Sequence, residues 1–193
     1  MSSRYDDELW ELVGPEPGPP PAHLREFVRS LGRVGQALDL GCGDGRLTLE
    51  LDAAELTAAD VSAVALSRAG RRLPGRPALA ELEPDAPLPF EDGSFDLVLC
   101  TETLEHVRDV QLLLSEIRRV LRPGGRLALT TPAHSRLTGL AILARGFEAR
   151  FEPLSPHLRF LTPRSLRELL DEHGFTFVSL RRRRRTLLAL ATR

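Results

Sequence analysis

The stretch QALDLGCGDG, residues 36–45, decides the fold class of this 193-residue chain. Its first half is a short apolar run typical of a buried strand, and its second half is a glycine-rich turn. The residues that follow, 45–51, have a helical pattern. A strand, a tight glycine turn and a helix in this order form the ligand-binding corner of open α/β sheets. We therefore expect a ligand at this turn.

Strand-like and helix-like segments alternate after this corner. Strand patterns occur at 55–60, 78–82, 94–100 and 126–131, and helical patterns at 62–72 and 109–122. This alternation predicts right-handed crossovers and a doubly wound, mostly parallel α/β sheet of the Rossmann-like kind. The last two apolar runs, 175–180 and 186–192, predict an antiparallel hairpin. Thr162 and Pro163 are typical of the cap and the first residue of a helix.

Two regions depart from this pattern. Residues 1–35 predict two short helices joined by a proline-rich linker, and we expect them to pack on a core formed by residues 36–193. Within that core, the segment 132–162 breaks the alternation and contains an apolar patch. We interpret it as a lid insertion over an aliphatic or aromatic substrate; the alternative is that it only covers the edge of the sheet.

Composition excludes several classes of protein. The chain is 42% hydrophobic and 27% charged, which rules out a disordered or fibrous protein, and its apolar runs are too short to span a membrane. Two cysteines and an acidic N-terminal stretch predict a cytoplasmic protein. The formal charge is −1, and the run Arg181–Arg185 is the one strongly basic segment. Since the rest of the chain is acidic, we interpret this run as a solvated hairpin. Nucleic acid is an unfavoured partner, but it is not excluded.

Acidic residues are predicted at the ends of the first three strands. Asp39 precedes the glycine turn, where its charge suits a ligand that carries an ammonium or sulfonium group. Asp60 ends the second strand, at the distance from the turn that suits a carboxylate accepting both ribose hydroxyls. After the third strand, Glu83 is our candidate for the adenine amino group; Glu81 and Asp85 are the alternatives. Position 46, where a dinucleotide fingerprint would place its third glycine, is Arg46, which argues against an NAD-dependent oxidoreductase.

At this point the sequence resembles the class I S-adenosylmethionine-dependent methyltransferases, of the type that acts on small molecules. The segments that carry the resemblance are LDLGCGDGRLT (38–48), AADVS (58–62), LPFEDGSFDLVLCTETLEHV (88–107) and LRPGGRLALTTP (121–132). The resemblance implies a seven-stranded sheet of order 3-2-1-4-5-7-6 with strand 7 antiparallel. It also implies a cofactor site for S-adenosyl-L-methionine formed by Asp39, Gly41, Cys42, Gly43, Gly45, Asp60, Val61, Glu83, Thr101 and Glu102.

The acceptor side centres on Glu102, Glu105 and His106. If this segment is helical, the spacing places all three on one face, where two carboxylates and an imidazole could bind a divalent cation such as Mg2+. The spacing is similar to that of the ubiquinone-pathway O-methyltransferases and the small-RNA 2′-O-methyltransferases, where such residues hold a metal. His157 is a further candidate ligand. Alternatively, His106 or His157 acts directly as a general base, or Glu105 and His106 only cap the next helix.

These observations lead to one leading function and two alternatives. The leading interpretation is methyl transfer to a small-molecule acceptor, most readily at oxygen. The first alternative is a metal-dependent RNA 2′-O-methyltransferase, which the Glu-x-x-Glu-His set and the arginine run favour. The second is a non-catalytic cofactor-binding protein of the same fold. The sequence does not identify the acceptor or the oligomeric state.

Overall fold

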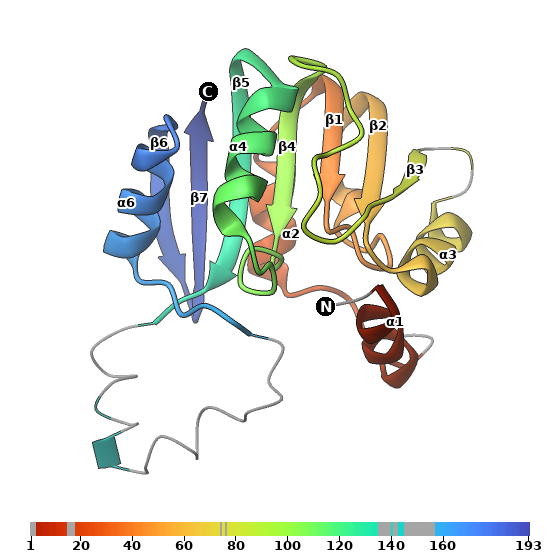
Figure 1. Ribbon diagram of the computed structural model, residues 1–193, viewed down its shortest axis with the longest axis horizontal. Helices are drawn as coiled ribbons and strands as arrows, with labels where there is room; N and C mark the ends of the chain where they lie inside the picture. The colour runs from red at the N-terminus through yellow and green to blue at the C-terminus, as the bar shows by residue number, and fades with distance from the viewer. Residues whose placement is uncertain are drawn as a thin grey trace.

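The computed structural model describes residues 3–14, 18–73, 75, 77–134, 140, 143–144 and 157–193. Among these residues, seven strands form one sheet in the order β3-β2-β1-β4-β5-β7-β6 (Figure 1). The strands are β1 (Val34–Leu40), β2 (Ala53–Asp60), β3 (Ala78–Glu81), β4 (Phe95–Thr101), β5 (Leu121–Pro132), β6 (Thr176–Arg183) and β7 (Thr186–Thr192). Strands β1 to β5 pair in parallel, whereas β7 is antiparallel to both β5 and β6. The predicted α/β class, strand order and antiparallel strand 7 are confirmed.

Helices cover both faces of this sheet (Figure 1). They are α1 (Ser3–Leu12), α2 (Ala22–Arg29), α3 (Ala63–Arg72), α4 (Val110–Val120) and α6 (Pro163–Glu172), with a 3₁₀ turn η1 (Thr48–Glu50). On one face, α4 and α6 bury Leu114, Ile117 and Leu166 in the larger apolar core. On the other, α2 contributes Val28 to a second core. The central strands are therefore buried on both faces, which explains their unbroken apolar runs.

The predicted cap and first residue of α6 are confirmed. The Thr162 hydroxyl accepts a hydrogen bond from the Ser165 amide at 3.1 Å, Pro163 is the first helical residue, and Gly174 follows the helix with φ +75°. The helix predicted over 45–51 is wrong, because only the three residues of η1 form a helical turn. The backbone must become extended by Leu51 to enter β2, and the Thr48 hydroxyl donates to the buried Asp39 carboxylate instead.

The hairpin formed by β6 and β7 contains the arginine run at the edge of the sheet. Arg181 lies opposite Leu188 and Arg182 opposite Leu187, so successive arginines lie on alternate faces, as predicted for a strand. All five arginines are exposed, and none forms a salt bridge with a carboxylate of the described residues. The run is therefore a cationic tip divided between two faces of the sheet.

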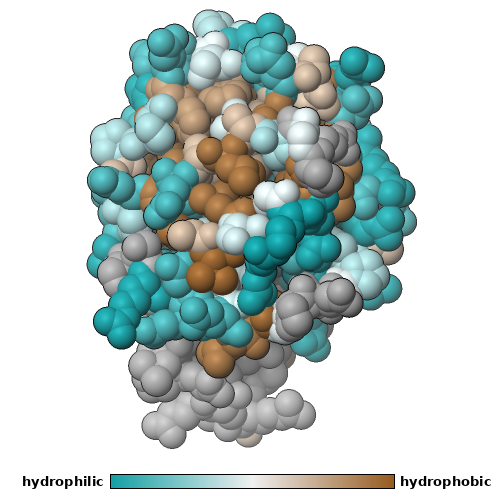
Figure 2. All heavy atoms as spheres, turned by 90° about the vertical axis from the view of Figure 1, so that its right-hand side faces the viewer, coloured by the Kyte–Doolittle hydropathy of each residue, from teal (hydrophilic) through white to brown (hydrophobic). Residues whose placement is uncertain are grey.

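The opposite edge of the sheet is formed by β3. On this side of the molecule, apolar atoms gather between hydrophilic side chains (Figure 2), and Leu79 of β3 remains 45% exposed. Within the described residues, no helix has the length and apolar character needed to cross a membrane. Most of the predicted lid, 132–162, lies outside the described residues.

Candidate functional site

The glycine turn after β1 forms the floor of a cavity of about 280 Å³ at the carboxyl edge of the sheet. Gly41 and Gly43 have positive φ angles, +72° and +55°. A Cβ atom at Gly41 would lie 2.3 Å from the Thr103 hydroxyl, and one at Gly43 would lie 2.6 Å from the Trp10 ring. Both positions therefore require glycine, and their bare backbone faces the cavity.

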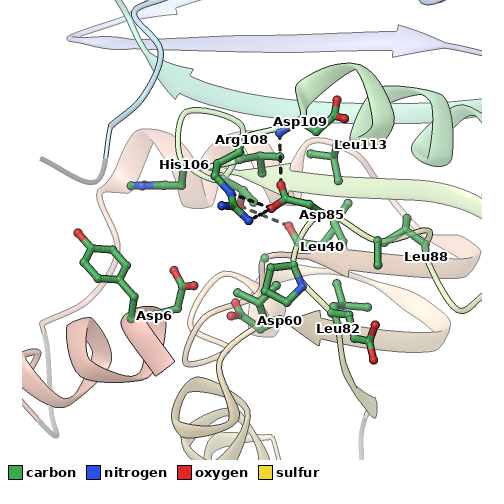
Figure 3. Close-up of a pocket in the computed structure, with 18 of the residues that line it drawn as sticks. Asp6, Leu40, Asp60, Leu82, Asp85, Leu88, His106, Arg108, Asp109 and Leu113 are labelled. Atoms are coloured by element: carbon green, nitrogen blue, oxygen red, sulfur yellow. Dashed lines mark hydrogen bonds and ion pairs between the residues drawn. The ribbon is translucent and has the colours of Figure 1, made fainter. Parts of the chain in front are cut away.

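The cavity is lined from four directions (Figure 3). Asp60 and Val61 come from the end of β2, and the segment 82–86 comes from beyond β3. The segment after β4 supplies Glu102, Thr103 and His106, while α1 closes the side that faces away from the sheet. Of the ten predicted cofactor residues, six line this cavity: Gly41, Gly43, Asp60, Val61, Glu83 and Glu102. The other four, Asp39, Cys42, Gly45 and Thr101, lie behind its wall.

Asp60 is the central carboxylate of the cavity. Its Oδ2 accepts a hydrogen bond from the Gly43 amide at 2.8 Å, and its Oδ1 accepts one from the Ser62 amide at 3.0 Å. Burial raises the pKa of Asp60, although these two bonds oppose the shift. The backbone donors fix the carboxylate next to the glycine turn, and each oxygen keeps lone-pair capacity for a ligand hydroxyl.

Asp39 lies beneath the turn rather than in the cavity. It is 1% exposed, and its Oδ2 accepts a 2.6 Å hydrogen bond from the Thr48 hydroxyl. Its Oδ1 is buried and has no hydrogen-bond partner in the described part of the chain. Burial and the nearby Asp60 charge raise the pKa of Asp39 to about 7, against the opposing effect of the Thr48 hydrogen bond. An orphaned buried oxygen of this kind is costly, and this suggests a role beyond folding.

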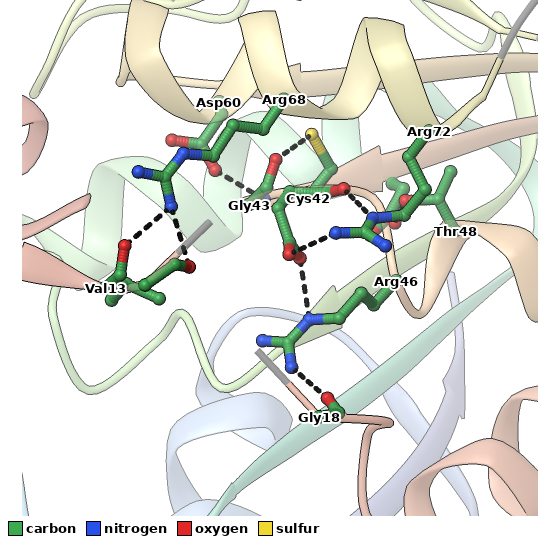
Figure 4. A network of polar contacts seen from close by, with 12 residues as sticks. Val13, Gly18, Cys42, Gly43, Arg46, Thr48, Asp60, Arg68 and Arg72 are labelled. Atoms are coloured by element: carbon green, nitrogen blue, oxygen red, sulfur yellow. Dashed lines mark hydrogen bonds and ion pairs between the residues drawn. The ribbon is translucent and has the colours of Figure 1, made fainter. Parts of the chain in front are cut away.

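The remaining residues of the turn have structural partners. The Cys42 side chain packs with Leu66 and Leu73 of the α3 region, and burial raises the pKa of its thiol. Gly45 faces Leu73, so its lack of a side chain permits close packing rather than ligand contact. The turn is further held by Asp44, which pairs with Arg46 at 2.8 Å and Arg72 at 3.0 Å (Figure 4).

The segment after β3 contains two acids that line the cavity, one of them paired with an arginine. Asp85, with φ +56°, accepts from the Arg108 guanidinium and, at 3.3 Å, from the Asp109 amide. Glu83 lines the same cavity, is exposed, and has no hydrogen bond or ion pair with a described residue. Because Asp85 is neutralised by Arg108, Glu83 is the better placed of the two to meet a polar ligand edge.

Helix α1 is the part of the cavity that sequence reasoning missed. Its residues Tyr5, Asp6, Leu9 and Trp10 line the cavity wall. The helix is attached to α3, because Asp7 accepts from the Ser62 hydroxyl at 2.6 Å and the Arg68 guanidinium lies 5.9 Å from the Trp10 ring centre. The sequence predicted a short helix here that packs on the core, but nothing in its pattern indicated that it would line the cavity.

The segment after β4 does not form the helix that would have aligned Glu102, Glu105 and His106. Residues 102–109 form turns and bends, and α4 begins only at Val110, with Asp109 as its cap. Glu102 has φ +50°, and its carboxylate accepts a 2.8 Å hydrogen bond from Thr130 on β5. Burial raises the pKa of Glu102. The bond to β5 engages the Glu102 carboxylate, and Glu102 is not part of the group that Glu105 and His106 form.

Three of the four predicted acceptor-side residues do come together. Ligand atoms of Glu105, His106 and His157 lie within 4.8 Å of one another, and Glu102 is not part of this group. The His106 and His157 ring centres are 4.9 Å apart, and His106 Nε2 is 4.0 Å from Glu105 Oε1. Glu105 is 1% exposed, and burial together with Glu102 raises its pKa to about 8. The Leu158 amide donates to the Glu105 carbonyl at 2.7 Å, which holds His157 beside the cluster.

Comparison with known proteins agrees with this architecture. Residues 38–129 match the family model described as a methyltransferase domain. The chain is 31% identical over 163 residues to a ubiquinone biosynthesis O-methyltransferase of Xanthomonas oryzae, covering 77% of this chain and 66% of that protein. It is 32% identical over 151 residues to O-methyltransferase cnsE of Penicillium expansum, covering 74% and 52%.

A solved S-adenosylmethionine-dependent methyltransferase of Mesorhizobium loti has the same fold, with a TM-score of 0.66, 22% identity, and coverage of 87% of this chain and 96% of that one. The chain spans between 31% and 66% of the length of the curated relatives that it matches. The glycine turn, the acid at the end of β2 and the strand order all agree with the matched family. The chain belongs to the class I S-adenosylmethionine-dependent methyltransferases.

Proposed function

We propose that this protein transfers the methyl group of S-adenosylmethionine to an oxygen atom of a small-molecule acceptor. One observation carries the proposal: the cavity formed by the glycine turn and Asp60 extends directly to His106, whose ring adjoins Glu105 and His157. A cofactor pocket and a cluster of proton-accepting groups therefore share one edge of the sheet. The names of the two relatives described above, both O-methyltransferases, support the same reaction class.

The residues of the cavity fit the cofactor. Gly41 and Gly43 expose backbone that a Cβ atom would cover, and the Asp60 carboxylate is positioned to accept ribose hydroxyls. The negative charge of Asp39 and Asp60 suits a ligand with a net positive charge. When bound, the cofactor supplies an electrophilic methyl group. The task that remains for the protein is to orient the acceptor and to remove its proton.

His106 is our candidate for the general base. It lines the cavity, and its ring lies beside that of His157. When His106 takes a proton from an acceptor hydroxyl, the resulting imidazolium lies close to the Glu105 carboxylate and stabilises its ionised form. Glu105 thereby favours the charged state of the base, and His157 packs beside its ring. In this proposal they assist His106 and do not accept the proton themselves.

A bound metal ion is the second candidate, because Glu105, His106 and His157 could act together as ligands. Two imidazoles and one carboxylate suit zinc, manganese or iron better than magnesium, which prefers oxygen ligands. Mg2+ is thus not supported as the metal, and Glu102, whose carboxylate accepts from Thr130, would not join the set. Such a metal would supply Lewis acidity, which would lower the pKa of an acceptor hydroxyl held beside Glu105, His106 and His157.

The test uses cofactor labelled in its methyl group, incubated with fractionated cell extract in the presence and absence of a chelator. We expect label in the small-molecule fraction, and its loss when His106 is replaced by Gln. His173→Gln is the matched control, since His173 ends α6 and does not line the cavity. Transfer that the chelator abolishes favours the metal version. Label in RNA, or binding of the cofactor with no transfer to any fraction, would contradict the proposal and favour one of the two alternatives.

A further inference from the structure

The cavity has a marked surplus of negative charge. Six carboxylates of the described residues line it: Asp6, Asp60, Glu83, Asp85, Glu102 and Asp109. Arg108 is the one guanidinium among the described lining residues, and it is already paired with Asp85. A cavity with this composition favours a cationic ligand and disfavours a neutral ligand of the same shape.

Asp6 and Glu83 are the carboxylates in this set whose side chains form no hydrogen bond or salt bridge with another described residue, and Asp6 is the less exposed of the two. Three consecutive acids of α1 have different surroundings. Asp7 accepts from Ser62 and so attaches α1 to α3, and Glu8 pairs with Arg4 on the outer surface. Asp6 extends from α1 toward the side of the cavity where Asp60 lies (Figure 3), and it forms no salt bridge with a described residue.

The position of Asp6 has an electrostatic cost in the absence of a ligand. Burial raises the pKa of Asp6, and its charge contributes to raising the pKa of Asp60 across the cavity. Two carboxylates that face one cavity destabilise each other. A positively charged ligand placed between them would remove that repulsion, and this is a reason to look for the function of Asp6 in binding.

The chemistry of the proposed cofactor provides such a charge and then removes it. S-adenosylmethionine and its demethylated product both carry an ammonium and a carboxylate group, but only the former carries the sulfonium charge. We propose that Asp6 is a specificity-determining residue, whose charge favours binding of S-adenosylmethionine over S-adenosylhomocysteine and so promotes release of the product. This inference rests on the proposed function for the identity of the cofactor. It adds a role for α1 in the replacement of bound S-adenosylhomocysteine by S-adenosylmethionine.

Isothermal titration calorimetry tests the proposal with three probes: S-adenosylmethionine, S-adenosylhomocysteine and sinefungin, in which a charged amine replaces the sulfonium group. We expect Asp6→Asn to weaken binding of the two charged probes by about five- to tenfold, the size of one partly screened charge interaction. Binding of S-adenosylhomocysteine should change less than twofold. The losses should shrink in high salt, because screening weakens interactions between charges.

Glu8→Gln is the control, because it removes the same charge from the same helix on its outer surface. It should leave the affinities for all three probes unchanged, and thermal unfolding verifies that each variant is folded. Equal losses for all three probes in Asp6→Asn would overturn the proposal, as would no loss for any of them. A wild-type protein that binds neither S-adenosylmethionine nor S-adenosylhomocysteine would instead refute the proposed function itself.

Discussion

Replacing Asp39 by Asn should stabilise the ligand-free protein at neutral and alkaline pH, increasingly so as the pH rises. The side chain is 1% exposed, its Oδ1 has no hydrogen-bond partner among the described residues, and its pKa is raised to about 7 from an ordinary value of 3.8. An acid whose pKa is higher in the folded state stabilises the fold while it is protonated. That stabilisation is lost as the pH rises from 3.8 through about 7.

The magnitude follows from the size of this pKa shift. Each pKa unit corresponds to about 1.4 kcal/mol, so the raised pKa of Asp39 lowers the free energy of unfolding, relative to strongly acidic pH, by about 2 kcal/mol at pH 5 and about 4 kcal/mol at pH 8. Asn still accepts the Thr48 hydrogen bond. Its amide nitrogen, however, would occupy the unpartnered site at a cost of about 1–3 kcal/mol at every pH. The advantage of the variant should therefore grow by about 2–3 kcal/mol between pH 5 and pH 8.

Urea unfolding of both proteins at pH 5, 6, 7 and 8, without cofactor, measures this growth. Taking the difference between the two proteins cancels the titration of groups that they share. Parallel pH profiles would refute the reasoning, because the Asp39 charge would then be compensated in the folded state. We also expect the Asn variant to bind S-adenosylmethionine more weakly. Stabilisation with loss of binding would identify Asp39 as a residue retained for function at the expense of stability.

Three further predictions address the cavity and the surface. Asp60→Ala should weaken S-adenosylmethionine binding by about 1–3 kcal/mol in calorimetry, since a charged acceptor is lost, and unchanged affinity would contradict its assignment to the ribose. Gly43→Ala should weaken binding of S-adenosylmethionine by more than about tenfold, because the new Cβ atom would clash with the Trp10 ring. Adding Trp10→Ala to this variant should restore part of the loss by removing the clash, while about 1–2 kcal/mol of positive-φ strain remains. Replacing Arg181–Arg185 with Gln should leave transfer to small molecules within about twofold of the wild type, because surface ion effects are small; a large loss would instead favour an anionic partner.

Much of the fold could be predicted because its signals are local. Alternating apolar runs, the glycine turn at 41–45 and the Thr162 cap each depend on neighbouring residues, and the structure agrees with all of them. The prediction of a longer helix after the glycine turn was wrong, because tertiary contacts limit the length of that helix. The chain has to return to the sheet at Ala53, and the Thr48 hydroxyl donates to Asp39. Neither constraint can be predicted from the pattern of neighbouring residues.

The sequence by itself determined the order of strands and helices, the turn that requires glycine, and the acids that end β1 and β2, because each follows from the conformational preferences of a few adjacent residues. The tertiary structure alone decided which distant groups meet. It brought α1 against the cavity, paired Asp85 with Arg108, gathered His157 beside Glu105 and His106, and turned Glu102 toward Thr130. These contacts join segments far apart along the chain, so they form only once packing of the whole sheet has fixed where each segment lies.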